Sequence, residues 1–382
     1  MFTGRDKALF IWFFLLVPVL LSAFIFKLQR TVPDIRHINI VMPPYNAVPD
    51  DETDDSPAFQ LALNDLKKKG GGVLFIPAGD YHFDEIVTIT NGSWGLMIRG
   101  ESMDSRLFCR NSNGIFRLTH TARKEEVTLR NLTMTADFAG AGTAFEITSP
   151  PGGANSKRIF IADNILITNR TAAGFFTKGI TAAGIYRPLI RNCEIYGPVD
   201  MDDVSDSSAN FQMETGIDIS DSYAPVIENC RVSGVSTAYL FSALPDSFPE
   251  DGAVRNSQVD YCRTGMIFRL TSGVREPTLW VTDCNFRSRD CSVLIESRRI
   301  FHITGNTFRQ LSENHALQDI HLKDCHLGII RNNVFEQNTF GMRKNLIIDA
   351  GGLDIIIAGN VWSDSTNVVL DISPEAEDVF LY

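Results

Sequence analysis

The chain has 382 residues, of which 44% are hydrophobic and 21% are charged, a composition that excludes wholesale disorder. Its formal net charge is 35 − 46 = −11, which argues against a nucleic-acid partner because binding to phosphates needs a basic surface. The seven cysteines include no C-x-x-C pair, so neither a zinc ribbon nor a fully paired disulfide framework is expected. The length suggests two or three domains, unless the chain is a solenoid with one continuous core.

Residues 8–26 form an uncharged apolar run that is long enough to cross about 30 Å of hydrocarbon as a helix. We expect an uncleaved transmembrane helix, since the run exceeds the apolar core of a signal peptide, which is the alternative. Residues 1–7 would be a short stub and residues 27–47, with prolines at 33, 43 and 44, a linker. The sequence thus predicts a single-pass membrane protein whose domain at 48–382 is extracytoplasmic, either periplasmic or extracellular.

A helix is expected after the linker, with Ser56 as its N-cap and Pro57 at its first position. Glycines at 70–72 end it. Its apolar face would consist of Phe59, Leu61, Leu63 and Leu66. Residues 73–81 then predict a strand, a turn and a second strand.

Downstream, the pattern N-x-x-apolar recurs, with the apolar residue returning every 22 to 37 residues. The apolar positions are Met134, Ile167, Ile195, Val232, Val259, Phe286, Phe308, Phe335 and Trp362. Each unit contains short alternating strands with Gly and Asn at the turns, which predicts an all-β parallel solenoid of about nine to ten coils. A second alignment, from Phe145–Thr148 to Val368–Asp371, places alternate residues inside. The predicted internal column is Ile147, Ile219, Phe241, Phe268, Ile295 and Leu322.

The acidic segment 50–55, the helix after it and the run G-G-V-L-F-I-P-A-G-D-Y at 71–81 resemble the opening of the pectate-lyase-like superfamily. The resemblance covers residues from about 45 onward. It implies a right-handed, single-stranded parallel β-helix with an N-terminal capping helix, of the polygalacturonase, pectate lyase and tailspike kind. That superfamily includes hydrolases, lyases, epimerases and non-catalytic adhesins, so fold alone does not define the chemistry. The ordered polygalacturonase motifs and the D-P-H-D of alginate epimerases are absent from this sequence.

Several conspicuous polar columns have structural explanations. Alternating charges at Arg269, Glu296, Lys323 and Asp349 predict an outward ladder of ion pairs. The turn asparagines are expected to form a buried amide ladder. Cys193, Cys230 and Cys284 are expected to be reduced core thiols. His315, His321 and His326 lack the tight spacing of metal ligands and are interpreted as surface residues.

The candidate site centres on Glu146 and Asp218, which share an outward column two strands apart. That spacing of about 9–10 Å lies at the top of the range used by inverting glycosidases. We expect Asp218, Glu146 and Asp221 to be catalytic. The expected substrate-binding residues are Asp202, Asp203, Tyr223, Tyr186 and Arg187. No cofactor or metal is expected, although Asp202, Asp203 and Asp206 leave a Ca²⁺ site open.

These features favour an anchored protein that processes an envelope or extracellular polysaccharide, as a glycoside hydrolase or a lyase. The alternatives are a non-catalytic glycan-binding or assembly component and a structural, adhesin-like β-helix; in both, the acidic residues are only a solvated surface. An outward aliphatic strip further predicts an interface with a second copy or another protein, unless the C-terminal tail covers it. The strip consists of Leu240, Ile267, Leu294, Ile347 and Val369.

Overall fold

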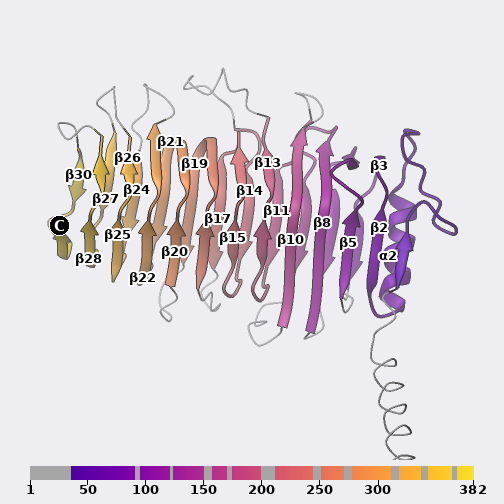
Figure 1. The fold of residues 1–382 in the computed structure, drawn as a ribbon, viewed down its shortest axis with the longest axis horizontal. Helices are drawn as coiled ribbons and strands as arrows, with labels where there is room; N and C mark the ends of the chain where they lie inside the picture. The colour runs from indigo at the N-terminus through magenta and orange to yellow at the C-terminus, as the bar shows by residue number, and fades with distance from the viewer. Residues whose placement is uncertain are drawn as a thin grey trace, which may run out of the picture. The chain divides into compact units, whose positions relative to one another are not determined.

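The computed structural model describes residues 36–90, 95–120, 124–149, 157–169, 174–198, 211–243, 251–270, 278–310, 318–336, 343–363 and 368–382. Residues 37–382 form one compact unit, a solenoid of parallel strands (Figure 1). The predicted transmembrane helix at 8–26 lies outside the described residues, among which no helix is long and apolar enough to cross a membrane. β1 (His37–Asn39) belongs to the solenoid, although it falls inside the segment predicted as a linker.

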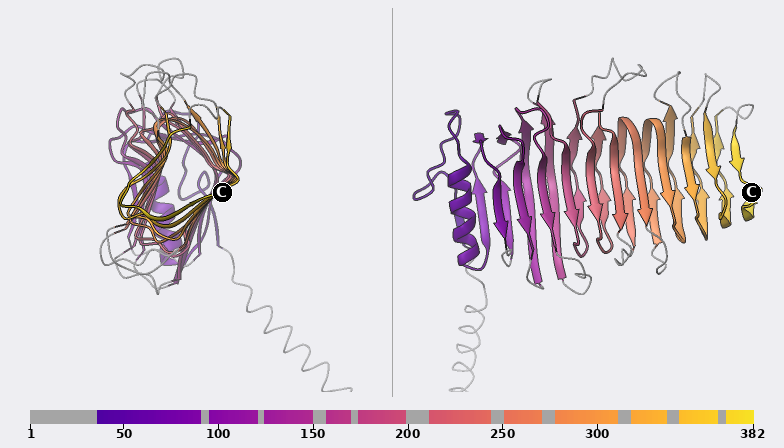
Figure 2. Two further views of the ribbon diagram at one scale, coloured as in Figure 1. Left: turned by 90° about the vertical axis from the view of Figure 1, so that its left-hand side faces the viewer. Right: turned by 180° about the vertical axis from the view of Figure 1, so that it is seen from behind.

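Each coil contributes strands to three stacks, which Figure 2 shows end-on and from behind. The first stack begins with β1 and continues through β2 (Gly72–Ile76), β5 (Leu96–Gly100), β8 (Lys124–Ala136), β10 (Lys157–Asn169), β12 (Leu189–Arg191), β15 (Val226–Glu228), β18 (Gly252–Arg255), β20 (Thr278–Thr282), β22 (Ile300–Thr304), β25 (Gly328–Arg331), β28 (Leu353–Ala358) and β31 (Glu377–Leu381).

The second stack contains β3 (Gly79–Phe83), β6 (Ser105–Cys109), the distal halves of β8 and β10, β13 (Glu194–Tyr196), β16 (Arg231–Ser233), the first halves of β19 (Gln258–Leu270) and β21 (Asn285–Glu296), β23 (Thr307–Gln310), β26 (Val334–Phe335) and β29 (Val361–Trp362). The third contains β4 (Val87–Thr90), β7 (Gly114–Thr119), β9 (Thr143–Thr148), β11 (Lys178–Ala183), β14 (Thr215–Ser220), β17 (Thr237–Ala243), the distal halves of β19 and β21, β24 (Gln318–Lys323), β27 (Lys344–Ile348) and β30 (Leu370–Ile372).

The all-β, parallel architecture confirms the predicted fold class, but the coil number was predicted too low. Within the described residues the first stack alone has thirteen strands. The repeat was counted from Asn131 onward, and the earliest coils lack the N-x-x-apolar turn by which it was recognised.

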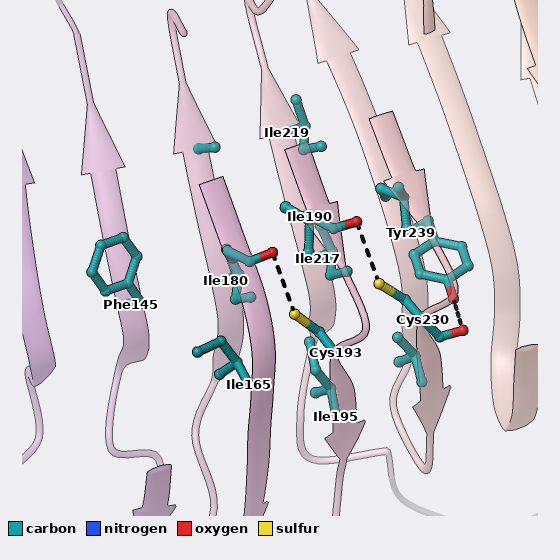
Figure 3. Packing of buried hydrophobic residues seen from close by; sticks show 14 of the residues in the cluster. Phe145, Ile165, Ile180, Ile190, Cys193, Ile195, Ile217, Ile219, Cys230 and Tyr239 are labelled. Atoms are coloured by element: carbon teal, nitrogen blue, oxygen red, sulfur yellow. Dashed lines mark hydrogen bonds between the residues drawn. The ribbon is translucent and has the colours of Figure 1, made fainter. Parts of the chain in front are cut away.

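The core is one continuous apolar column inside the coils. Figure 3 shows part of it, where Phe145, Ile180 and Ile217 follow one another on successive strands. The predicted internal residues are each at most 3% exposed, which confirms the column: Ile147, Ile219, Phe241, Phe268, Ile295 and Leu322. Cys193 and Cys230 are buried, unpaired thiols as predicted, and the Cys230 thiol lies 3.5 Å from the Ile190 carbonyl.

The only helix among the described residues, α2 (Ser56–Lys68), covers the N-terminal end of this core. Phe59, Leu63 and Leu66 are fully buried, and the Phe59 ring packs 4.8 Å from that of Phe83. Two details of the prediction were wrong. Leu61 is 42% exposed, because it lies on the opposite side of the helix from Leu63, and the N-cap is Asp55 rather than Ser56.

The turn asparagines do not form the predicted buried ladder. Asn164, Asn192 and Asn229 are exposed and adopt the left-handed conformation, with φ between 53° and 59°. Asparagine is favoured there because it tolerates that conformation better than other residues with a Cβ. A buried amide ladder does exist in the last coils, at the residue that follows the left-handed turn position. Asn306 Nδ2 donates to Asn333 Oδ1, and Asn333 Nδ2 donates to Asn360 Oδ1, each at 3.0 Å.

Candidate functional site

The outward face of the third stack carries the residues predicted to be catalytic. Parallel pairing aligns Glu146 with Thr181 and Thr181 with Asp218, so the predicted shared column is confirmed. Two steps of about 4.8 Å place the two backbones about 10 Å apart. The complete column on this face is Thr88, Arg117, Glu146, Thr181, Asp218, Leu240, Ile267, Leu294, His321, Ile347 and Asp371.

Both carboxylates lie against cations of the same face. Arg117 Nε is 2.7 Å from Glu146 Oε2, and Lys178 Nζ is 2.7 Å from Asp218 Oδ2. Asp218 is only 7% exposed, and Glu146 is half-buried. A glycosidase general acid is typically held in an apolar pocket. Here, in contrast, the two carboxylates and the cations beside them, Arg117 and Lys178, form a row of opposite charges. The row can bind polar groups of a ligand and stabilise a developing negative charge.

An aromatic pair lies at the next corner of the coil. The rings of Tyr186 and Tyr223 stack with centroids 4.9 Å apart and planes 12° apart, and the Arg187 guanidinium lies 5.2 Å from the Tyr186 ring. Asp221 begins the turn that connects Asp218 to Tyr223, and its N–H donates to the Ser242 carbonyl at 3.0 Å. The structure therefore places Glu146 on β9 and Asp218 on β14, and the other predicted residues in the turns that follow β11 and β14. Asp202, Asp203 and Asp206 lie outside the described residues, as does the Ca²⁺ site they would form.

The predicted aliphatic strip is shorter than expected. Leu240, Ile267 and Leu294 are half-buried on adjacent strands, but His321 interrupts the column and Ile347 is only 7% exposed. Val369 was misplaced: Leu346 pairs with Leu370, so Asp371 rather than Val369 follows Ile347. The predicted alignment of the last coil was wrong by two residues, because this coil is shorter than the one before it. A shift of two residues keeps the alternation of inward and outward side chains, so the sequence pattern alone did not reveal it.

The sequence prediction missed the cations that complete the row and the role of His321. Lys178 stands three residues before Thr181, a spacing that the strand alignment could have shown. His321 is hydrogen-bonded on both sides, with Nδ1 3.0 Å from Gln318 Oε1 and Nε2 3.0 Å from Asp349 Oδ2. The predicted ion-pair ladder is present as well: Glu296 contacts both Arg269 and Lys323. Among the described residues no cluster of three or more potential metal ligands occurs.

The family model for rhamnogalacturonase A/epimerase, pectate lyase-like proteins matches residues 38–296. The chain belongs to this family. This confirms the predicted resemblance over the opening segment and the coils that carry Glu146 and Asp218. No curated protein matches the sequence.

Solved structures agree with the fold. The A-module of the mannuronan C-5 epimerase AlgE4 of Azotobacter vinelandii is similar with a TM-score of 0.56 at 13% identity, over 91% of this chain and all of that one. The tailspike protein of the E. coli bacteriophage HK620, solved with a pentasaccharide, has a TM-score of 0.64 at 12% identity, over 90% of this chain and 65% of the tailspike. At these identities the similarity establishes the fold.

Proposed function

We propose that this protein binds and processes a polysaccharide on the outward face of the third stack, around Glu146 and Asp218. The observation that carries the proposal is the alignment of these two carboxylates on either side of Thr181, each beside a cation. Membership in a family named for a rhamnogalacturonase and an epimerase supports a glycan as the substrate. So does the pentasaccharide bound to the similar tailspike.

The row offers two kinds of chemistry. In hydrolysis, one carboxyl would protonate the leaving oxygen while the other activates water; the backbones that carry them lie about 10 Å apart, which leaves room for that water. In elimination from a sugar acid, Asp218 or Asp221 would take the ring proton next to the sugar carboxylate, and Lys178 and Arg117 would offset the negative charge that develops. The glycosidic C–O bond on the next carbon would then break as the C=C bond forms, and water would protonate the leaving oxygen. Tyr186 and Tyr223 would support a sugar ring by stacking, and Arg187 would donate hydrogen bonds to it.

A non-catalytic glycan-binding role is the second candidate, and the ion pairs favour it. Lys178 and Arg117 each hold a carboxylate at 2.7 Å, so a proton-transfer step has to displace a cation first. Binding needs no such displacement, because the paired charges can exchange hydrogen bonds with hydroxyl groups. In this form the protein would hold a polysaccharide for an assembly or secretion machine.

We further propose that residues 8–26 anchor the chain in a membrane with the β-helix on the extracytoplasmic side. The length of this apolar run supports the proposal. Extraction of membranes with alkaline carbonate should leave the full chain in the pellet, and a protease added outside the cytoplasm should digest it. Release by carbonate, or protection from the protease, would contradict the anchor or its orientation.

The functional test compares Asp218→Asn with Asp260→Asn. Asp260 is a matched control because it is also 7% exposed and paired with an arginine, Arg231, but lies on the second stack. The full chain is assayed with neutral and acidic oligosaccharides for new reducing ends, for unsaturated products and for binding by calorimetry. We expect Asp218→Asn to abolish turnover and Asp260→Asn to retain it. Binding without turnover in the unmodified protein would support the non-catalytic role, and full activity of Asp218→Asn would place the site elsewhere.

A further inference from the structure

The outward face of the first stack carries an apolar column along the whole described solenoid. Ten of its thirteen positions are apolar, whereas the water-facing side of a sheet is normally polar. The column, called here the first-stack strip, is His37, Val73, Met97, Thr128, Ile161, Leu189, Val226, Ala253, Trp280, His302, Ile329, Ile356 and Phe380.

The strip faces outward, and its members are half-buried or exposed except for Thr128 and Ala253, which are 8% and 3% exposed. After Leu189, Val226 and Ile329, the next residue in each strand is a buried core isoleucine and the one after it is charged, so the strip lies on the side of the strands away from the core. Exposure increases toward the C-terminal end, where Ile356 is 39% and Phe380 is 43% exposed. Twelve intervals of about 4.8 Å make the strip about 58 Å long. A contiguous apolar surface of this size normally marks an interface.

The two edges of the strip differ in charge. One edge, two residues beyond the strip, carries five arginines and two carboxylates: Arg99, Arg130, Asp163, Arg191, Glu228, Arg255 and Arg331. Asp163 pairs with Arg130 and Arg191, but among the described residues Arg99, Arg255 and Arg331 have no carboxylate within ion-pair distance. The other edge, two residues before the strip, carries Glu126, Asp251, Asp354 and Asp378.

We propose that the first-stack strip binds a second copy of this chain, side by side and parallel, about a two-fold axis that runs along the strip. Rotation about such an axis exchanges the two edges, so the arginine edge of one copy meets the acidic edge of the other. Arg255 then faces Asp251 of the second copy, and Arg130 faces Glu126. Arg191 would face Arg187, but Arg191 is already paired with Asp163 at 3.0 Å. An axis along the strands would instead oppose the two arginine edges.

Shape and area also favour a second copy. A flat strip about 58 Å long needs a partner that is equally long and straight, and another solenoid has that form. The strip and its two edges are three columns of side chains, which together span about 14 Å along the strands. With a length of about 58 Å, this face measures about 800 Å² on each copy, which is the usual contribution of one partner to a stable interface. A parallel pair also brings the first coils, which begin at His37, to the same end, as two chains anchored in one membrane require.

The test uses the full chain in detergent, with its mass measured by sedimentation over a range of concentrations. We expect a dimer that Ile329→Asp dissociates, with the dissociation constant raised at least tenfold, because a charge would be buried unpaired. Ile267→Asp, on the outward face of the third stack, is the matched control and should remain dimeric. Circular dichroism and the melting temperature establish that each variant is folded. A monomer or a trimer of the unmodified chain, or dissociation by Ile267→Asp alone, would overturn the proposal.

Two further experiments, a charge exchange and a cysteine cross-link, test the geometry even if Ile329→Asp fails to fold. Arg255→Asp and Asp251→Arg should each weaken the dimer, and the double exchange should restore it, because the two residues face each other across the axis. Leu189→Cys lies on the axis and should form an intermolecular disulfide with its own copy on mild oxidation, whereas Leu240→Cys should not. Failure of the double exchange, together with the absence of the Leu189→Cys cross-link, would overturn the parallel arrangement.

Discussion

Asp319 and Arg343 form an ion pair that is fully buried inside the coil. Arg343 Nε and Nη2 lie 2.7 Å from the two carboxylate oxygens, and Asn345 Nδ2 donates to Asp319 Oδ2 at 3.0 Å. Burial raises the pKa of Asp319 to about 6 despite the guanidinium. Asp319 continues an inward column that otherwise contains small residues, including Gly265 and Ser292. This pair could not be predicted from the sequence, because Asp319 and Arg343 come from different coils.

Asp319→Asn should lower the free energy of unfolding by about 3–5 kcal/mol, since it leaves Arg343 as an uncompensated buried charge. The double variant Asp319→Leu, Arg343→Met should cost less than the single one, because it removes both charges. The raised pKa means that the folded chain holds an extra proton between about pH 4 and pH 6, so this carboxyl's contribution to stability falls as the pH rises through that window. Urea denaturation at several pH values measures both effects. Equal losses in the single and double variants would contradict this account.

Arg298 is also buried, at 1% exposure, but no carboxylate in the described part of the chain forms an ion pair with it. Among the described residues none of its three guanidinium nitrogens has a hydrogen-bond partner, and the group lies 4.5 Å from the Phe268 ring. Burial lowers its pKa to about 9, so it is still charged at neutral pH. A charge in this position opposes folding.

We therefore expect Arg298→Met to raise the free energy of unfolding by about 1–3 kcal/mol. Arg298→Lys keeps the charge and should bring no gain. Thermal and urea denaturation of both variants measure the change. A less stable Arg298→Met protein would show that the guanidinium has a partner, such as a bound anion.

At the scale of the turns, the repeat depends on a left-handed residue between the first and second stacks. Asn229 has φ 53° and is exposed, so its backbone conformation rather than its burial explains the choice of residue. The sequence correctly predicted where these turns occur. It did not distinguish an exposed turn from a buried amide ladder, because asparagine serves both, as Asn306 and Asn333 show in the later coils.

Asn229→Ala should cost about 1–2 kcal/mol, because a Cβ is strained in the left-handed conformation. Asn229→Gly should be nearly neutral, since glycine adopts it freely. Urea denaturation separates the two variants. Equal losses would mean that the side-chain amide, which contacts Asn192 Oδ1 at 3.4 Å, is what stabilises the turn.

At the scale of the whole molecule, the sequence predicted the parallel β-helix, its capping helix and the internal column. These follow from alternation and repeat length, which are local properties. It also aligned Glu146 with Asp218, because register in a solenoid follows from the repeat. The cations beside them, Lys178 and Arg117, were missed because each belongs to a different coil. The first-stack strip was missed too, since its members lie three residues before the turn asparagines, outside the N-x-x-apolar pattern used to align the repeats.

If a glycan lies over Glu146 and Asp218, a crystal structure of the protein with acidic oligosaccharides should show it. We expect density across β9, β11 and β14, with a sugar ring near Tyr186 and Tyr223 and polar contacts to Lys178 and Asp218. Density confined to the second stack, or to the arginine edge of the first-stack strip, would contradict the proposed site.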